Sequence, residues 1–167
     1  MRALLLGFAV ALSGCSFTTA GNFTECKTDL DCGNATACVR GYCLPLPAGC
    51  KRDEAGGTKN AFTSTNRIPL VALLPITTES GTIDDSEVQS ANAMKLAISE
   101  ANERLTAARG LSGLFVCDTD APDGGHLQLQ ATWFIENLRA PFFLVSSRSP
   151  TTYVAQNVAR VDAGTLI

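Results

Sequence analysis

The sequence predicts an α/β fold, a partial doubly wound parallel sheet of three to four strands preceded by a small disulfide-stapled module. From residue 67 onward, apolar runs alternate with helical segments. Continuous apolar runs indicate strands buried on both faces, and parallel neighbours need helical crossover connections. Before residue 51 the pattern is different, because cysteines crowd a stretch that has almost no apolar periodicity.

The first strand is expected at 68–74, where the chain is almost wholly apolar and carries its proline near the start. A helix is expected next, with Thr82 or Asp84 as its N-cap, because apolar residues recur at steps of three and four. The members of this stripe are Val88, Ala91, Met94, Ile98, Ala101 and Leu105.

Two further strands are expected at 114–117 and 141–145. Between them a second helical stripe predicts a helix, formed by Leu127, Ala131, Phe134, Ile135 and Leu138. After the third strand, Ser149 and Pro150 have the pattern of an N-cap and first helical residue, and a fourth strand is expected to begin at 165–167.

The cysteine-rich segment is expected to be held by disulfides, because it cannot bury enough apolar surface to fold without cross-links. Its cysteines are Cys26, Cys32, Cys38, Cys43 and Cys50, and Cys117 lies far along the chain. A metal site is less favoured, since the segment has no Cys-x-x-Cys pair and His126 is remote. Five cysteines cannot pair among themselves, so one reaches Cys117, pairs with another chain or stays free. Cys50, the last of the five, is the candidate.

Residues 1–14 are expected to be a lipoprotein signal peptide. Arg2 supplies a positive start, residues 3–12 are apolar, and Leu12-Ser13-Gly14-Cys15 has the form of a lipobox. Cys15 is then the lipidated residue, with an ordinary secretory signal as the alternative. The apolar run is too short to span a bilayer. Ser16 in place of aspartate favours the outer membrane in enteric-type sorting, so we expect a lipid-anchored envelope protein.

These features divide the chain into a signal peptide (1–14), a Cys-rich module (15–50), a polar linker (51–66) and an α/β lobe (67–167). The linker prediction depends on the small, polar and charged composition of 51–66 and on Gly56-Gly57.

The chain has 13 Lys and Arg against 16 Asp and Glu, a formal charge of −3. No basic excess is present to recruit nucleic acid.

The lobe resembles the first half of the N-terminal lobe in the type I periplasmic binding proteins, the leucine/isoleucine/valine-binding and receptor ligand-binding family. Leu73-Leu74-Pro75-Ile76-Thr77 is similar to the family's first strand exit, and Phe115-Val116-Cys117-Asp118 is similar to its second strand. Leu138–Phe143 resembles the approach to the third strand, whereas Val145–Ser149 departs from the family's Gly-Pro-x-Ser-Ser. The Cys-rich segment is similar to the N-termini of myxobacterial surface lipoproteins.

The resemblance implies a solute-binding lipoprotein related to the amino-acid-binding proteins of ABC transporters, with a small-molecule ligand such as an amino acid. In open parallel sheets, ligands bind beyond the carboxyl ends of the strands. The candidate ligand-binding residues there are Thr77, Thr78, Ser147, Ser149 and Thr151. No catalytic residue, metal or cofactor is expected, and Asp118 and Asp120 are interpreted as strand-end caps rather than an acid–base pair.

Only one partial lobe can be built from this sequence, so we expect the chain as written to bind such solutes weakly or not at all. An alternative class is a cell-surface interaction or structural lipoprotein, in which the Cys-rich module binds a protein partner.

Overall fold

A four-stranded mixed sheet is the centre of the structure, a computed structural model that describes residues 24–54, 57–64, 66–78, 80–104, 111–122 and 126–146. Its strands are β3 (Cys50–Arg52), β4 (Arg67–Leu74), β5 (Leu111–Asp118) and β6 (Phe142–Val145), in the spatial order β3-β5-β4-β6. Strand β4 pairs in parallel with both β5 and β6. The predicted α/β class is confirmed. The sheet is mixed rather than wholly parallel, because β3, which the sequence does not predict, pairs antiparallel with β5.

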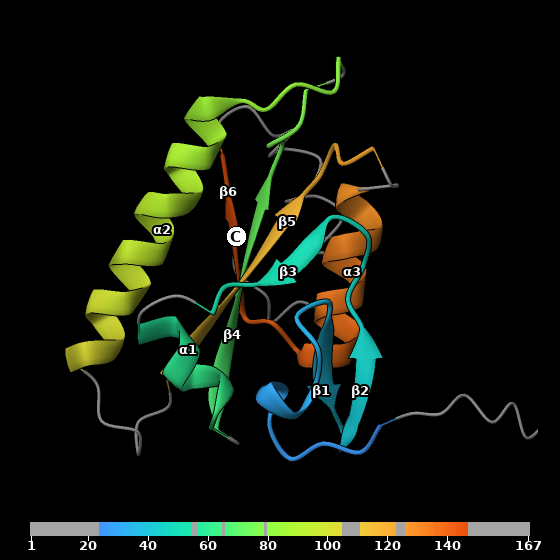
Figure 1. Cartoon of the computed structure of the whole chain (residues 1–167), viewed down its shortest axis with the longest axis vertical. Helices are drawn as coiled ribbons and strands as arrows, with labels where there is room; N and C mark the ends of the chain where they lie inside the picture. Colours follow the sequence, from blue (N-terminus) through green and yellow to red (C-terminus); the bar gives the residue numbers. More distant parts are fainter. Residues whose placement is uncertain are drawn as a thin grey trace, which may run out of the picture.

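Helices cover both faces of this sheet (Figure 1). Helix α2 (Asp85–Arg104) follows β4, and α3 (Leu127–Leu138) follows β5. Along β4, Val71 and Leu73 belong to the core on the α3 side, while Ala72 and Leu74 belong to the core on the α2 side. All four side chains are fully buried. The strand is therefore apolar on both faces, which is why its sequence is a continuous apolar run.

The two predicted helices are present with most of the expected contacts. Asp84 begins α2 by accepting a hydrogen bond from the Ser86 backbone N–H at 2.9 Å. Ala91 and Ile98 of the predicted stripe are buried, whereas Ala101 is exposed and the adjacent Asn102 is buried instead. Asn102 is tied to β5, because its side-chain amide donates to Ser112 O and accepts from Ser112 N, each at 2.8 Å.

Helix α3 buries Ala131, Phe134 and Ile135 against the other face of the sheet. It ends at Arg139, which has the left-handed backbone conformation common at helix C-termini. The predicted third helix and fourth strand lie outside the described residues, as do Leu105 and Gly110. Within the described ranges, no helix is both long enough and apolar enough to cross a membrane.

The Cys-rich segment forms a short 3-10 helix (Asp29–Asp31) and an antiparallel hairpin of β1 (Thr36–Val39) and β2 (Tyr42–Pro45). Two disulfides hold it, Cys26–Cys38 and Cys32–Cys43. The third disulfide joins Cys50 to Cys117, which face each other across β3 and β5. Disulfide bonding is confirmed, and Cys50 is indeed the cysteine that pairs outside the segment.

The linker prediction for 51–66 is wrong over the residues that the structure describes there. Lys51 and Arg52 belong to β3, which is antiparallel to β5, and residues 57–62 form a helix, α1 (Gly57–Phe62). Thr58, Ala61 and Phe62 share one helical face and are fully buried. The Phe62 ring packs edge-on against Phe115 at 5.4 Å between centroids. A single short turn with two apolar residues has too weak a periodicity to be recognised from sequence.

Gly113 makes the packing of α1 possible. A Cβ atom at this position would lie 2.9 Å from Phe62 Cε1, so only glycine lets the ring approach the strand this closely. The Arg52 guanidinium lies over the same Phe62 ring, 5.6 Å from its centroid, and forms a cation–π pair with it. Phe62 thus anchors the segment that precedes β4.

The Cys-rich module and the lobe share one core. Ala37, Val39 and Leu46 of the module are buried in the same cluster as Phe115 and Phe134 of the lobe. The Asp29 carboxylate, also fully buried, accepts a hydrogen bond from Cys38 N at 2.6 Å and lies 2.8 Å from Arg67 Nε at the start of β4. The module is therefore packed onto the sheet as part of one folded unit.

This ion pair is strongly desolvated. Burial raises the pKa of Asp29 above its ordinary value, and the nearby Arg67 guanidinium opposes that rise. Burial also lowers the pKa of Arg67, with Asp29 opposing. Arg52 adds a second buried guanidinium, which donates to the backbone carbonyls of Asp29 and Cys32 and pairs with Glu54 at 2.5 Å. These contacts join the module, β3 and β4 through polar groups that must remain paired.

Candidate functional site

The carboxyl ends of β4 and β5 meet at one edge of the sheet, where the sequence places the ligand site. Asp118, the last residue of β5, joins the two strand exits. Its carboxylate accepts hydrogen bonds from the Thr77 backbone N–H at 3.1 Å, from the Thr77 hydroxyl at 2.5 Å and from Asp120 N–H at 3.2 Å. The interpretation of Asp118 as a strand-end cap is confirmed, and the loop after β4 is held in place by it.

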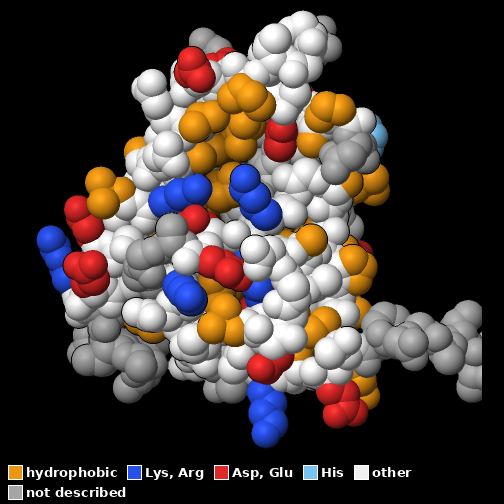
Figure 2. Space-filling view, viewed as in Figure 1, with side chains coloured by type: hydrophobic (Ala, Val, Ile, Leu, Met, Phe, Trp, Pro, Cys, Tyr) orange, Lys and Arg blue, Asp and Glu red, His pale blue; other side chains and the backbone are white. Residues whose placement is uncertain are grey.

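A hollow of about 570 Å³ opens beside this junction. It lies between β3, the loop that follows β4 and the loop that follows β5. Its apolar lining consists of Ile76, Ile83, Val116, Ala121 and Pro122. Figure 2 shows hydrophobic side chains gathered on the upper part of this face, with basic side chains directly below them. The volume lies within the range of small-molecule sites.

Two oppositely charged side chains, Lys51 and Asp118, also line the hollow. Lys51 is exposed on β3, and Asp118 is half-buried at the end of β5. Ile83 is 59% exposed, although it is a large apolar residue. A site with an apolar wall, an ammonium group and a carboxylate has the elements that bind a small amphipathic zwitterion.

The floor of the hollow depends on a close approach between the segment before β3 and the end of β5. Gly49 has a φ of 75°, and a Cβ there would lie 2.5 Å from the carbonyl oxygen of Asp118. The Asp118 N–H donates to Gly49 O at 2.9 Å. The buried amide of Gln130 closes the gap by donating to Ala48 O at 2.8 Å and to Asp118 O at 2.9 Å. Glycine is required here by both space and backbone conformation.

The predicted ligand-binding threonines lie at this edge but do not line the hollow. Thr77 is buried and its hydroxyl donates to Asp118, so its role in the structure is to fix the loop. Thr78 is half-buried, and its hydroxyl lies 2.8 Å from that of Ser80 and 2.7 Å from that of Thr82. Ser147, Ser149, Thr151 and the lipidation candidate Cys15 lie outside the described residues.

Sequence reasoning missed Lys51, Ile76 and Ile83 as site residues. Lys51 was grouped with a polar run that has no periodicity, and its pairing with Val116 across β3 and β5 is a long-range contact. Ile76 directly precedes Thr77, and Ile83 lies beside Thr77 through an isolated antiparallel β-bridge. The sequence spacing does not predict this bridge. Ile76 could have been found from its position just after a buried strand, because α/β sheets bind their ligands beyond the carboxyl ends of their strands.

No metal ligand set is available in the described ranges beyond one group of cysteine sulfurs. The sulfurs of Cys26, Cys32 and Cys43 lie within 4.8 Å of one another. All three belong to disulfides, so they offer no thiolate to a metal ion. Their proximity reflects two neighbouring cross-links in a small module.

Comparison of the chain with models of known protein families, with curated proteins and with solved structures finds no match. The functional interpretation therefore depends on the geometry of the site and on the residues themselves.

Proposed function

We propose that this chain is a solute-binding protein whose ligand, a small zwitterion of the amino-acid class, occupies the hollow at the carboxyl ends of β4 and β5. The observation that carries the proposal is the composition of that hollow, an apolar wall bordered by Lys51 and Asp118. It lies at the edge of the parallel strands where α/β sheets bind their ligands. The resemblance to type I periplasmic binding proteins supports the same ligand class.

The chemistry of the lining matches the three parts of an amino acid. The Lys51 ammonium suits a ligand carboxylate, and Asp118 suits a ligand ammonium. A carboxylate offers about four acceptor positions. Three hydrogen bonds already reach Asp118, from Thr77 N, Thr77 Oγ1 and Asp120 N, so one acceptor position remains for a ligand. Ile76, Ile83 and Val116 supply the surface for an aliphatic side chain.

The expected affinity of this one-sided site is low. Half-burying a leucine-sized side chain contributes about 1 kcal/mol. Two solvent-exposed charge pairs add about 0.2–1 kcal/mol each. The sum, about 1.4–3 kcal/mol, corresponds to a Kd of about 10–100 mM. Tighter binding requires a second surface that closes over the open side of the hollow.

The cellular setting belongs to the same proposal. We infer that the protein is exported, lipidated at Cys15 and held at the outer membrane or the periplasmic face of the cell envelope. Substitution Cys15→Ser is expected to move the protein from the membrane fraction to the soluble fraction. A variant that stays in membranes after signal cleavage contradicts the lipid anchor.

The interaction-protein alternative gains no support from the described module, whose buried apolar residues face the lobe.

Paired ligand and protein changes test the proposed site. Leucine is titrated against the full chain, together with leucinamide, which lacks the carboxylate, and N-acetyl-leucine, which lacks the ammonium. Lys51→Glu is expected to weaken leucine binding at least about threefold and not to weaken the binding of leucinamide, a cation that has no carboxylate for Lys51. Lys59→Glu, an equal charge change on exposed Lys59 of α1, is the control. Equal effects of the two variants on leucine binding contradict the proposal.

A further inference from the structure

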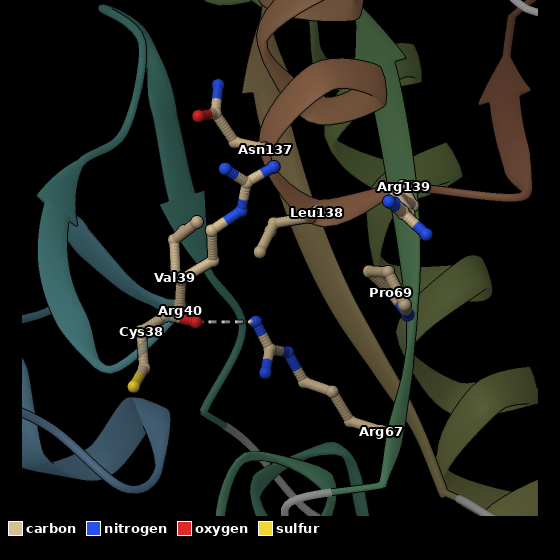
Figure 3. Close-up of a pocket in the computed structure, with 8 residues that line it drawn as sticks. All are labelled: Cys38, Val39, Arg40, Arg67, Pro69, Asn137, Leu138 and Arg139. Carbon is tan, nitrogen blue, oxygen red and sulfur yellow. Dashed lines mark hydrogen bonds between the residues drawn. The ribbon is translucent and has the colours of Figure 1, made fainter.

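A second cavity, of about 310 Å³, lies at the opposite end of β4 from the proposed solute site. It is bounded by the β1–β2 turn, the start of β4 and the end of α3. Figure 3 shows Arg40 and Arg67 extending into the space between the hairpin and the sheet, with Asn137 above Arg40 and Arg139 on the far side of Leu138. We call this space the arginine cavity, defined by Arg40, Arg67 and Arg139.

The lining of the arginine cavity is strongly unbalanced in charge. Three arginines and Asn137 contribute to it, and no acidic residue among those described lines it. The Asp29 carboxylate lies 2.8 Å from Arg67 Nε and offsets the positive charge of Arg67. The C-terminal end of α3 contributes about half of an elementary negative charge. More than one positive charge therefore remains unbalanced among the described residues that line or directly contact the cavity.

Two of the three arginines occupy backbone conformations that arginine disfavours. Arg40 has a φ of 52° and Arg139 a φ of 51°, and they are the positive-φ residues other than glycine in the part of the chain that the structure describes. Glycine or asparagine is the usual choice at such positions. Both arginines line the same cavity, and Figure 3 places Arg139 beyond Leu138 from Arg40. A strained residue of this kind points to a function of its side chain.

Helix capping does not explain Arg139. Two carbonyl groups near the end of α3 accept from backbone donors, because Arg139 N–H donates to Ile135 O at 3.1 Å and Ala140 N–H donates to Phe134 O at 3.2 Å. Glycine at residue 139 would make the same backbone bonds with less strain. The guanidinium itself is therefore not needed for the helix end.

We propose that the arginine cavity binds a phosphate-type oxyanion. Guanidinium groups bind phosphate and carboxylate oxygens through paired N–H donors. Two contacts hold the Arg67 guanidinium in place. Its Nε pairs with the Asp29 carboxylate, and its Nη2 donates to the Cys38 carbonyl at 3.4 Å. Arg40 comes from the module and Arg67 from the lobe, and both extend into the same space (Figure 3), so an anion bound there joins the module to the lobe.

The first experiment titrates inorganic phosphate into the full chain at constant ionic strength, followed by calorimetry or by amide NMR shifts. Arg40→Gly and Arg139→Gly each remove a guanidinium and relieve the positive-φ strain, so both variants are expected to keep or raise the melting temperature. Arg40→Gly is expected to weaken phosphate binding about tenfold, and Arg139→Gly less, because the Arg139 side chain lies beyond Leu138. Arg104→Ala, an equal charge loss at the end of α2 on the other face of the sheet, is expected to leave binding unchanged.

A second arm identifies the source of the phosphate group. Sedimentation with phosphatidylcholine vesicles, with and without phosphatidylglycerol, tests a lipid headgroup. Binding of phosphate alone assigns the cavity to a soluble anion. Vesicle binding that Arg40→Gly combined with Arg139→Gly abolishes assigns it to a headgroup. Should a glycine variant fold poorly, Arg40→Lys replaces it, with intermediate weakening expected. The proposal is overturned if neither probe binds, or if binding survives Arg40→Gly combined with Arg139→Gly.

Discussion

Removing the Cys50–Cys117 disulfide is expected to destabilise the protein more than removing any other cross-link of the described chain. The two cysteines are 67 residues apart, against 12 for Cys26–Cys38 and 11 for Cys32–Cys43. The chain-entropy relation for a loop of 67 residues gives about 4 kcal/mol at 25 °C. For a loop of 12 residues the same relation gives about 3 kcal/mol.

The assay is urea unfolding of the double variant Cys50→Ala with Cys117→Ala, with linear extrapolation to water. The matched control is Cys26→Ala with Cys38→Ala, which removes a cross-link without detaching β3 from β5. Mass spectrometry without reductant checks that the other two disulfides remain in each variant. A loss under about 1 kcal/mol for the Cys50 and Cys117 variant, or free thiols at both positions in the native protein, contradicts a stabilising cross-link between β3 and β5.

Three further substitutions test the contacts described above, each by urea unfolding. Gly49→Ala places a Cβ 2.5 Å from Asp118 O at a positive φ, so we expect a loss of about 1–3 kcal/mol, and an unchanged stability contradicts the described floor of the hollow. Phe62→Ala empties a fully buried site and is expected to cost about 3–5 kcal/mol, whereas a flexible linker at this position predicts almost no loss. Arg67→Met leaves the Asp29 carboxylate buried without its ion-pair partner, so we expect a loss of about 3–5 kcal/mol at neutral pH. The pKa of Asp29 is already raised by burial and rises further without the guanidinium, so the deficit relative to the wild type is expected to shrink as the pH falls through that raised pKa. A deficit that does not change with pH contradicts this account of the ion pair.

The parallel part of the sheet and its two long helices could be predicted because their signals are local. The run Val71 to Leu74 is buried on both faces, and the stripes of α2 and α3 repeat over several turns. Burial of these segments determines the residue types that they carry. The same reasoning located the edge of the sheet at which Asp118 caps the β4 exit.

Strand β3 and helix α1 could not be predicted, because long-range contacts stabilise them. β3 has three residues, two of them basic, and its stability comes from pairing with β5 and from the Cys50–Cys117 disulfide. Helix α1 is too short to be stable alone, and Phe62 holds it through the space left by Gly113. The charged composition that suggested a solvated linker contains Arg52, which is buried.

The same limitation applied to the candidate site. Lys51 reaches the hollow only because β3 lies beside β5, and the hydroxyl of Thr77, expected to contact a ligand, is used within the protein. The arginine cavity combines three residues that are far apart in sequence, Arg40, Arg67 and Arg139. No spacing rule brings these residues together, because the hairpin, the first long strand and the second long helix meet only in the folded chain.

Methyl NMR of the full chain titrated with leucine tests the proposed amino-acid site, because it detects binding in the expected range of about 10–100 mM. We expect the methyl resonances of Ile76 and Ile83 to move together with a single Kd, while that of Ile135, a buried residue of α3, stays in place. Lys51→Glu is expected to weaken the response at both resonances. If Ile76 and Ile83 do not shift at saturating leucine, or shift equally with leucine and with leucinamide, the hollow is not an amino-acid site.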